Sequence, residues 1–247
     1  MTPEVGIRSI LSKAASGALD LDFPKNLYCL CCEDTCEKSR IHGICDSCAA
    51  QMNWLDHDPF RASLDEFAFD RVMSCCVYGF YARKIIHGLK LHSRTYIAEN
   101  IGLLMAEKAK LEGGSFTAVV PVPMTPAKKR KRGYNQTELL SKYISRELKL
   151  PVWKDVLEKV RETRSMRLST GEERRSLLEG AYKAPEEARG KLNGADILLV
   201  DDVVTTGSTA DACAIALKDA GARSVSVLCF ASTARGYIDS AEDNVVQ

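Results

Sequence analysis

The amino-acid sequence predicts an α/β protein in which a parallel sheet follows a small four-cysteine module. Two short, β-branched apolar runs, at 118–123 and 197–200, each end at prolines or polar residues, as buried parallel strands do. A helical pattern from 208 to 221 and a further strand at 225–229 follow the second run, and this order indicates a parallel sheet. Clustered cysteines in a polar stretch near the start indicate the separate module.

The chain is predicted to have three parts with different residue patterns. Apolar residues at roughly helical spacing predict a helix within 1–22. The segment 23–56 holds six of the ten cysteines and few large apolar residues, so something other than hydrophobic burial must fold it. The main domain, 57–247, begins with a β-like run at 73–80, and helical stripes follow it before the strand at 118–123.

One helix of the main domain begins at a recognisable cap. Asn135 can cap it with Glu138 three residues later, and five apolar residues then form one face. These residues are Leu139, Leu140, Tyr143, Ile144 and Leu148. The later helix begins at Ser208 or Thr209, and Gly221 is a natural end for it.

Composition is that of a soluble globular chain. Of the 247 residues 45% are hydrophobic and 27% charged, and the formal net charge is +1. That charge gives no overall attraction to nucleic acid or to a membrane surface, so such a partner needs a local patch. Charged residues such as Glu4, Arg8 and Lys13 interrupt the start of the chain, and we expect no membrane insertion. Ten cysteines without a secretory signal favour a reducing, cytoplasmic location.

Four cysteines have the spacing of a tetrahedral zinc site. Two C-x2-C pairs are separated by twelve residues, a pattern suited to Zn²⁺, whose binding would supply folding free energy to this segment. The predicted ligands are Cys29, Cys32, Cys45 and Cys48. Cys31, Cys36 and His42 are alternative ligands, with Cys31 in place of Cys32. Free thiols or a disulfide are the competing interpretation, and a zinc ribbon serves either a structural role or contacts with nucleic acid or a protein.

A polar sequence follows Val200, and its residue types suit a phosphate and a ribose. Two aspartates and a Thr/Gly/Ser turn lie at the carboxyl end of a predicted strand, where open α/β sheets bind ligands. Backbone N–H groups at the start of the next helix can hold a phosphate, and two carboxylates can accept from a ribose 2′,3′-diol. Gly207 allows a close backbone approach. The predicted site residues are Asp201, Asp202, Thr205, Thr206, Gly207, Ser208 and Thr209.

Three other interpretations of this segment are weaker. A Walker A loop needs a lysine after its last glycine, but Gly207 is followed by Ser208 and Thr209. A receiver domain also begins with an apolar strand that ends in acids, but only 45 residues follow Asp202. Paired Asp and Thr residues could merely cap a helix, although the match to the whole pattern would then be a coincidence.

The segment 197–209 resembles the phosphoribosyl pyrophosphate (PRPP) binding signature of the type I phosphoribosyltransferase fold. With PVP at 121–123, KRGYNQ at 131–136 and the four cysteines, the chain resembles the ComF family of competence-associated, GntX-like proteins from about Phe23 to Ala231. The chain departs from that family in the loop expected to close over substrate. There it has no Gln after Thr163, and it has Leu177 where the family has an Asn.

The resemblance also implies where a pyrophosphate group would bind. The segment after the first of the two predicted strands, Val122 to Thr125, would form a pyrophosphate loop, with Arg132, Gly133, Asn135 and Gln136 beside it. The pyrophosphate-side candidates are Val122, Pro123, Met124, Lys90 and Arg132.

Two functions follow from the resemblance. The first is a Mg²⁺-dependent enzyme that transfers ribose 5-phosphate and releases pyrophosphate, with the metal held mainly by the ligand itself. The alternative is a non-catalytic PRPP-binding protein that handles single-stranded DNA during DNA uptake in natural transformation, alongside proteins of the uptake machinery. A basic run beside Tyr134 could follow a phosphate backbone or form only a solvated face. The run is Lys128, Lys129, Arg130, Lys131 and Arg132.

Overall fold

The computed structural model describes residues 28–35, 40–91, 94–161, 178 and 180–233. The expected helix within 1–22, Cys36 and the two departures in the expected substrate-closing loop lie outside the described residues. In the described part, no helix is long and apolar enough to cross a membrane.

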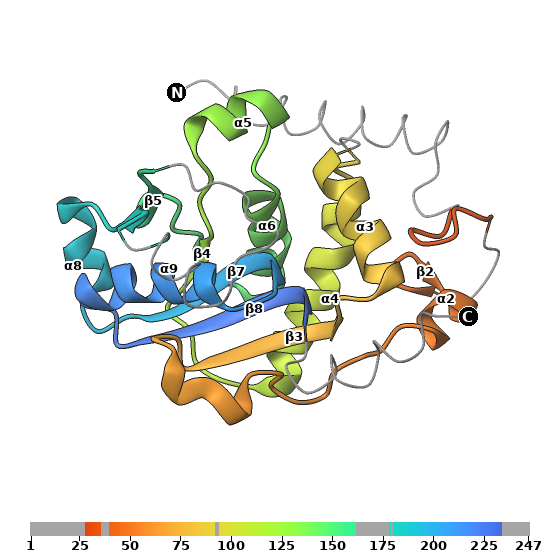
Figure 1. Ribbon diagram of the computed structural model, residues 1–247, viewed down its shortest axis with the longest axis horizontal. Helices are drawn as coiled ribbons and strands as arrows, with labels where there is room; N and C mark the ends of the chain where they lie inside the picture. Colours follow the sequence, from red (N-terminus) through yellow and green to blue (C-terminus); the bar gives the residue numbers. More distant parts are fainter. Residues whose placement is uncertain (1–27, 36–39, 92–93, 162–177, 179, 234–247) are drawn as a thin grey trace, which may run out of the picture.

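A four-stranded parallel sheet forms the centre of the main domain (Figure 1). Its strands, in spatial order, are β3 (Arg71–Val77), β8 (Ser224–Ser232), β7 (Asp196–Val204) and β4 (Ala118–Pro121). The predicted parallel-sheet α/β fold is confirmed. The strand predicted at 197–200 is longer than expected, because β7 pairs with β8 as far as Val204.

Helices cover both faces of this sheet (Figure 1). On one face lie α3 (Phe80–Leu91), α4 (Ile97–Glu112) and α6 (Gln136–Leu148), whose buried residues share one core with the sheet. On the other face lies α9 (Ser208–Asp219), which belongs to a second core. Asn135 caps α6 as predicted, because its side chain accepts the backbone N–H of Thr137.

Shorter elements complete the main domain. They are η1 (Arg61–Glu66), α5 (Pro126–Arg132), β5 (Glu158–Lys159), β6 (Tyr182–Lys183), η2 (Glu186–Ala188) and α8 (Arg189–Leu192). The strands β5 and β6 pair antiparallel with each other, and β6 packs against α9. The helix α5 projects at one end of the molecule, between β4 and α6 (Figure 1).

The cysteine-containing segment consists of a hairpin and one short helix. Its elements are β1 (Arg40–Ile41), β2 (Ile44–Cys45) and α2 (Asp46–Ala50). Leu30, Ile44 and Met52 are buried in the same core as α3 and α4. The chain then crosses to the sheet, where Trp54 forms an antiparallel bridge with Cys76 of β3. The two parts share a core. The domain boundary expected between 56 and 57 stays a prediction.

Candidate functional site

Asp201 and Asp202 lie at the carboxyl edge of the sheet because β7 is longer than its neighbour β4. Pro121, the last residue of β4, pairs with Val200, and the Val122 N–H donates to the Val200 carbonyl at 2.9 Å. Beyond this point β7 pairs only with β8 among the described strands. The two aspartates therefore lie past the end of β4, next to the loop that follows it, where open α/β sheets bind ligands.

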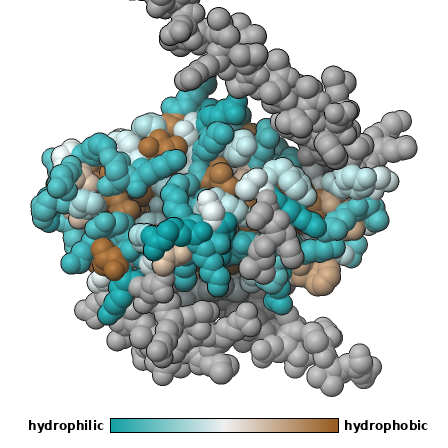
Figure 2. All heavy atoms as spheres, turned by 90° about the horizontal axis from the view of Figure 1, so that it is seen from above, coloured by the Kyte–Doolittle hydropathy of each residue, from teal (hydrophilic) through white to brown (hydrophobic). Residues whose placement is uncertain are grey.

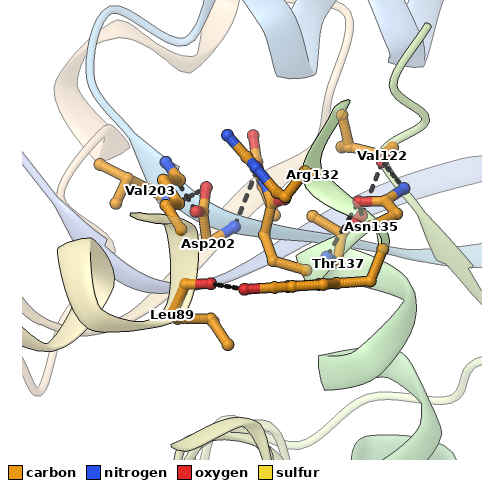
Figure 3. A network of polar contacts seen from close by, with 11 residues as sticks. Leu89, Val122, Arg132, Asn135, Thr137, Asp202 and Val203 are labelled. Carbon is orange, nitrogen blue, oxygen red and sulfur yellow. Dashed lines mark hydrogen bonds and ion pairs between the residues drawn. The ribbon is translucent and has the colours of Figure 1, made fainter. Parts of the chain in front are cut away.

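Asp202 forms an ion pair with Lys90, which reaches it from the last turn of α3. Lys90 Nζ lies 2.6 Å from Asp202 Oδ2, and the aspartate side chain is only 4% exposed. The other carboxylate oxygen accepts the Val203 N–H at 3.0 Å (Figure 3). Asp201 is buried as well, and its Oδ1 accepts the Asp202 N–H at 2.8 Å. A cation expected near the cleft thus contacts an acid expected on the ribose side.

Burial and neighbouring charges shift the pKa values of Asp201 and Lys90. Burial, together with the adjacent Asp202 carboxylate, raises the pKa of Asp201 well above its usual range. Burial opposes the charge of Lys90, but its interactions with Asp202 and Asp201 together outweigh burial and raise the pKa of the Lys90 ammonium. The two adjacent carboxyl groups therefore lie beside one cation, Lys90, which contacts Asp202. Carboxyl oxygens accept hydrogen bonds, so this pair suits the hydroxyl donors of a diol.

The segment Thr205–Thr209 connects β7 to α9 and includes the first two residues of that helix. No side chain caps the start of α9. The N-cap is Gly207, with φ at 80°, so no side chain competes for the first N–H groups of α9. The Thr206 and Ser208 hydroxyl oxygens lie 3.0 Å apart, and Thr233 Oγ1 donates to the Thr205 carbonyl at 2.7 Å. Uncapped N–H groups at the positive end of a helix dipole can hold a phosphate.

The expected pyrophosphate loop follows β4 and is held by the start of α6 (Figure 3). The Val122 carbonyl accepts Asn135 Nδ2–H at 3.2 Å and lies 2.7 Å from the Thr137 hydroxyl. The Thr137 N–H donates to Asn135 Oδ1 at 3.1 Å, so the helix cap and the loop anchor form one network. Pro123 and Met124 continue the loop and are half-buried.

Tyr134 and Thr137 make contacts that sequence reasoning did not assign. The Tyr134 hydroxyl donates to the Leu89 carbonyl, which places the start of α6 next to the residue before Lys90. Arg132 donates to Gln136 Oε1 and, in the view of Figure 3, lies between Asp202 and the Val122 network. The segment 131–137 thus connects the two sides of the site. Its signal in the sequence was the KRGYNQ motif, and the contacts of Thr137 extend this network by one residue.

The four predicted zinc ligands lie together. The Sγ atoms of Cys29, Cys32, Cys45 and Cys48 are all within 4.8 Å of one another. The backbone N–H groups of Cys31 and Cys45 each donate to Cys29 Sγ at 3.3 Å. Burial would raise the pKa of the Cys29 thiol, but hydrogen bonds from these N–H groups and from Cys32 together outweigh burial and lower the pKa to about 6. Four close thiols, one of them stabilised as a thiolate, fit Zn²⁺.

The alternative ligands are not part of this cluster, and Cys36 lies outside the described residues. Cys31 is buried and its thiol interacts with those of Cys29 and Cys48, but it is not one of the four clustered thiols. His42 Nε2 lies 2.8 Å from Glu107 Oε2 on α4. The cysteines of the described part are free, so no disulfide is present among them. The remaining four, Cys75, Cys76, Cys213 and Cys229, are buried in the core.

The basic run coincides with α5. Lys128, Lys129, Arg130 and Lys131 are exposed, whereas Arg132 is half-buried at the site. Lys129 forms an ion pair with Glu138 at 2.7 Å. The face seen from the side of α5 is mainly hydrophilic, with apolar residues in separate spots (Figure 2). The run therefore presents four cations to solvent, whereas Arg132 is half-buried and donates to Gln136.

Buried acids, an uncapped helix start and a second anchored loop meet at one edge of a parallel sheet, the edge at which open α/β sheets bind their ligands. The chain belongs to the phosphoribosyl transferase domain family, which matches residues 113–246.

Relatives support the resemblance to ComF proteins. Competence protein F of Haemophilus influenzae is 24% identical over 220 residues, which cover 84% of this chain and 91% of that protein. The DNA utilization protein YhgH of Escherichia coli K12 is 28% identical over 171 residues, or 67% of this chain and 73% of the relative. The predicted ComF-type protein with a phosphoribosyltransferase fold is confirmed.

A solved structure with some likeness is the glutamine PRPP amidotransferase from B. subtilis complexed with ADP and GMP. It is 20% identical with a TM-score of 0.36, over 53% of this chain and 25% of that one. The chain thus matches a quarter of that larger protein.

Proposed function

We propose that the site binds PRPP with Mg²⁺. The ribose diol would contact Asp201 and Asp202, and the 5′-phosphate would contact the N–H groups of Thr205–Thr209. The pyrophosphate would lie along the loop Val122–Thr125, called the Val122 loop below, near Arg132 and Lys90. The observation that carries this proposal is the buried aspartate pair, with Lys90 at Asp202, next to an uncapped helix start, because PRPP carries a diol between two anionic groups.

Magnesium would bind mainly to oxygens of the ligand. Mg²⁺ keeps several waters and takes one or two carboxylates at most, and Asp202 already has a lysine partner. When bound, the ion neutralises charge that develops on the leaving pyrophosphate. The chain's own contribution is to hold the diol, the 5′-phosphate and the pyrophosphate in fixed positions.

Transfer of the phosphoribosyl group is the reaction that this arrangement supports. A lone pair of the acceptor forms a bond to ribose C1 while the bond from C1 to the pyrophosphate oxygen breaks. Pyrophosphate leaves with that electron pair, and the acceptor loses a proton. Positive charge on the ribose ring would be stabilised by the negative charge of Asp202, and Arg132 and Lys90 would stabilise the leaving group.

A second function, the handling of single-stranded DNA, is favoured by α5. Four exposed cations on one short helix offer a sequence-independent contact for a phosphate backbone. The names of the relatives, "Competence protein F" and "DNA utilization protein YhgH", point the same way. On this proposal the PRPP site and the basic helix act in one protein that works with the DNA-uptake machinery.

We also propose a structural Zn²⁺ on the four cysteines. The hairpin and α2 place only a few apolar residues in the shared core, and metal binding would supply part of the free energy that orders them.

One experiment separates transfer from binding alone. Pyrophosphate release from PRPP and Mg²⁺ is measured over a panel of nucleobases, with and without single-stranded DNA. In parallel, the rise in melting temperature caused by PRPP reports binding. Release that depends on one base supports the transferase. A thermal shift without release supports the binding protein. The absence of both a thermal shift and pyrophosphate release would contradict both proposals.

A further inference from the structure

Three phenylalanine rings lie against the loop that joins β7 to α9. Phe67 and Phe69 are stacked, with centroids 4.6 Å apart and planes at 15°. Phe60 meets Phe67 edge-on at 5.7 Å. A Cβ placed on Gly207 would lie 2.9 Å from Phe67 Cε1 and 3.3 Å from Phe60 Cε1. The close approach expected at Gly207 is therefore one to an aromatic ring of its own chain.

The segment that carries these rings is fixed at both ends. At its start the Asp58 carboxylate accepts the Phe60 N–H at 2.8 Å and the Val72 N–H at 3.0 Å. Next to Phe67, the Ala68 N–H donates to Asp211 Oδ1 at 2.7 Å, and this aspartate lies in the first turn of α9. Phe67 is thus held against the start of α9 by a hydrogen bond of the next residue.

A glycine with φ at 80° needs such a neighbour to keep one conformation. Glycine populates positive and negative φ about equally, so a free loop would sample several arrangements of its N–H groups. The Phe67 ring lies directly against Gly207, in the space that a Cβ at this position would occupy. Fixing the loop before the ligand arrives lowers the entropy that binding must remove.

We propose that Phe67 is a positioning residue for the 5′-phosphate part of the PRPP site, because its ring holds Gly207 in the conformation that presents the N–H groups of α9. This inference rests on the proposed function. It assigns a binding role to the segment 58–70, which lies outside every motif of the sequence analysis. The Val122 loop is anchored separately, by Asn135 and Thr137, so Phe67 affects one half of the ligand only.

The test compares two ligands with Mg²⁺ by calorimetric titration of the full chain. PRPP uses both halves of the site, whereas inorganic pyrophosphate uses only the Val122 loop. Phe67→Leu is expected to lower the affinity for PRPP about tenfold, which corresponds to about 1.4 kcal/mol. The affinity for pyrophosphate should fall by less than about twofold. Phe67→Met, which keeps a long side chain at this position, serves if Phe67→Leu fails to fold.

Phe69→Leu is the matched control. It also removes one phenyl ring from the stack, and Phe69 is more buried than Phe67. The atoms nearest to a Cβ placed on Gly207, however, belong to Phe67 and Phe60. PRPP affinity that falls with Phe67→Leu and not with Phe69→Leu supports the positioning role. Equal effects of both variants, or an equal loss of pyrophosphate affinity, overturn it. Failure of the unmutated protein to bind PRPP would instead overturn the proposed function.

Discussion

Lys90 Nζ lies 2.6 Å from Asp202 Oδ2, and this ion pair joins the last turn of α3 to the carboxyl end of β7. The aspartate is almost fully buried, whereas the lysine is partly exposed. Removing the cation would leave a buried carboxylate without a partner, which is costly, while a neutral residue at 202 would remove that cost.

Lys90→Met is therefore expected to lower the free energy of unfolding by about 2 kcal/mol, and less in an Asp202→Asn background. Urea denaturation of the four proteins of this double-mutant cycle measures the effect. Lys84→Met, an exposed lysine on the same helix, is the control and should change stability by less than about 0.5 kcal/mol. Strictly additive effects of the two substitutions would show that the pair contributes nothing.

Asp201 is predicted to reduce stability at neutral pH. Its folded-state pKa is raised by burial and by Asp202, so the folded state binds its proton more tightly than the unfolded state does. The unfolding free energy should fall as pH rises above about 4, the pKa of an unfolded aspartate. Asp201→Asn should accordingly stabilise the protein at pH 8 and change little near pH 4.

Asp196 provides a control of opposite sign for this pH series. Hydrogen bonds from the Arg223 and Ser224 side chains lower the pKa of Asp196 to about 2. Its contribution is present above pH 4 and is lost as pH falls toward 2, so Asp196→Asn should destabilise the protein at pH 8. Denaturation midpoints of both variants over this pH range check the prediction. A destabilising Asp201→Asn at pH 8 would contradict the assigned environment.

The zinc prediction distinguishes two neighbouring cysteines. The protein purified without chelators should contain about one zinc per chain, and Cys45→Ser should lose it, because three thiols bind Zn²⁺ less tightly than four. Cys31→Ser should keep the metal, since Cys31 lies outside the cluster. Elemental analysis of the three proteins measures this. Metal retained by Cys45→Ser, or lost by Cys31→Ser, would reassign the ligands.

The basic helix makes a prediction about salt dependence. Replacing Lys128, Arg130 and Lys131 by Gln should weaken single-stranded DNA binding and reduce the slope of log affinity against log salt by about 2. Fluorescence anisotropy over a salt series measures both. Gln at Lys142, Lys149 and Lys183, which are exposed outside α5, is the matched control. An identical loss in both triple variants would mean that charge in general, and not α5, attracts the DNA.

Motifs with fixed spacing were predictable from the sequence, and contacts between distant segments were not. The cysteine pairs and the cap at Asn135 depend on residues close in the chain, and the structure places them as expected. The end of β7 was placed too early, because apolar residues stop at Val200 while pairing with β8 continues. The contact of Phe67 with Gly207 joins residues far apart in sequence, and no sequence pattern predicts it.

The most direct test of the central claim is calorimetric titration of the protein with PRPP in the presence of Mg²⁺. The account predicts saturable binding with one site per chain, and affinity reduced at least about tenfold in the double variant Asp201→Asn, Asp202→Asn. Asp196→Asn, an acid at the opposite end of β7, should bind like the unmutated protein. No binding by the unmutated protein, or equal affinity in the double variant, would contradict the assignment of these aspartates to a PRPP site.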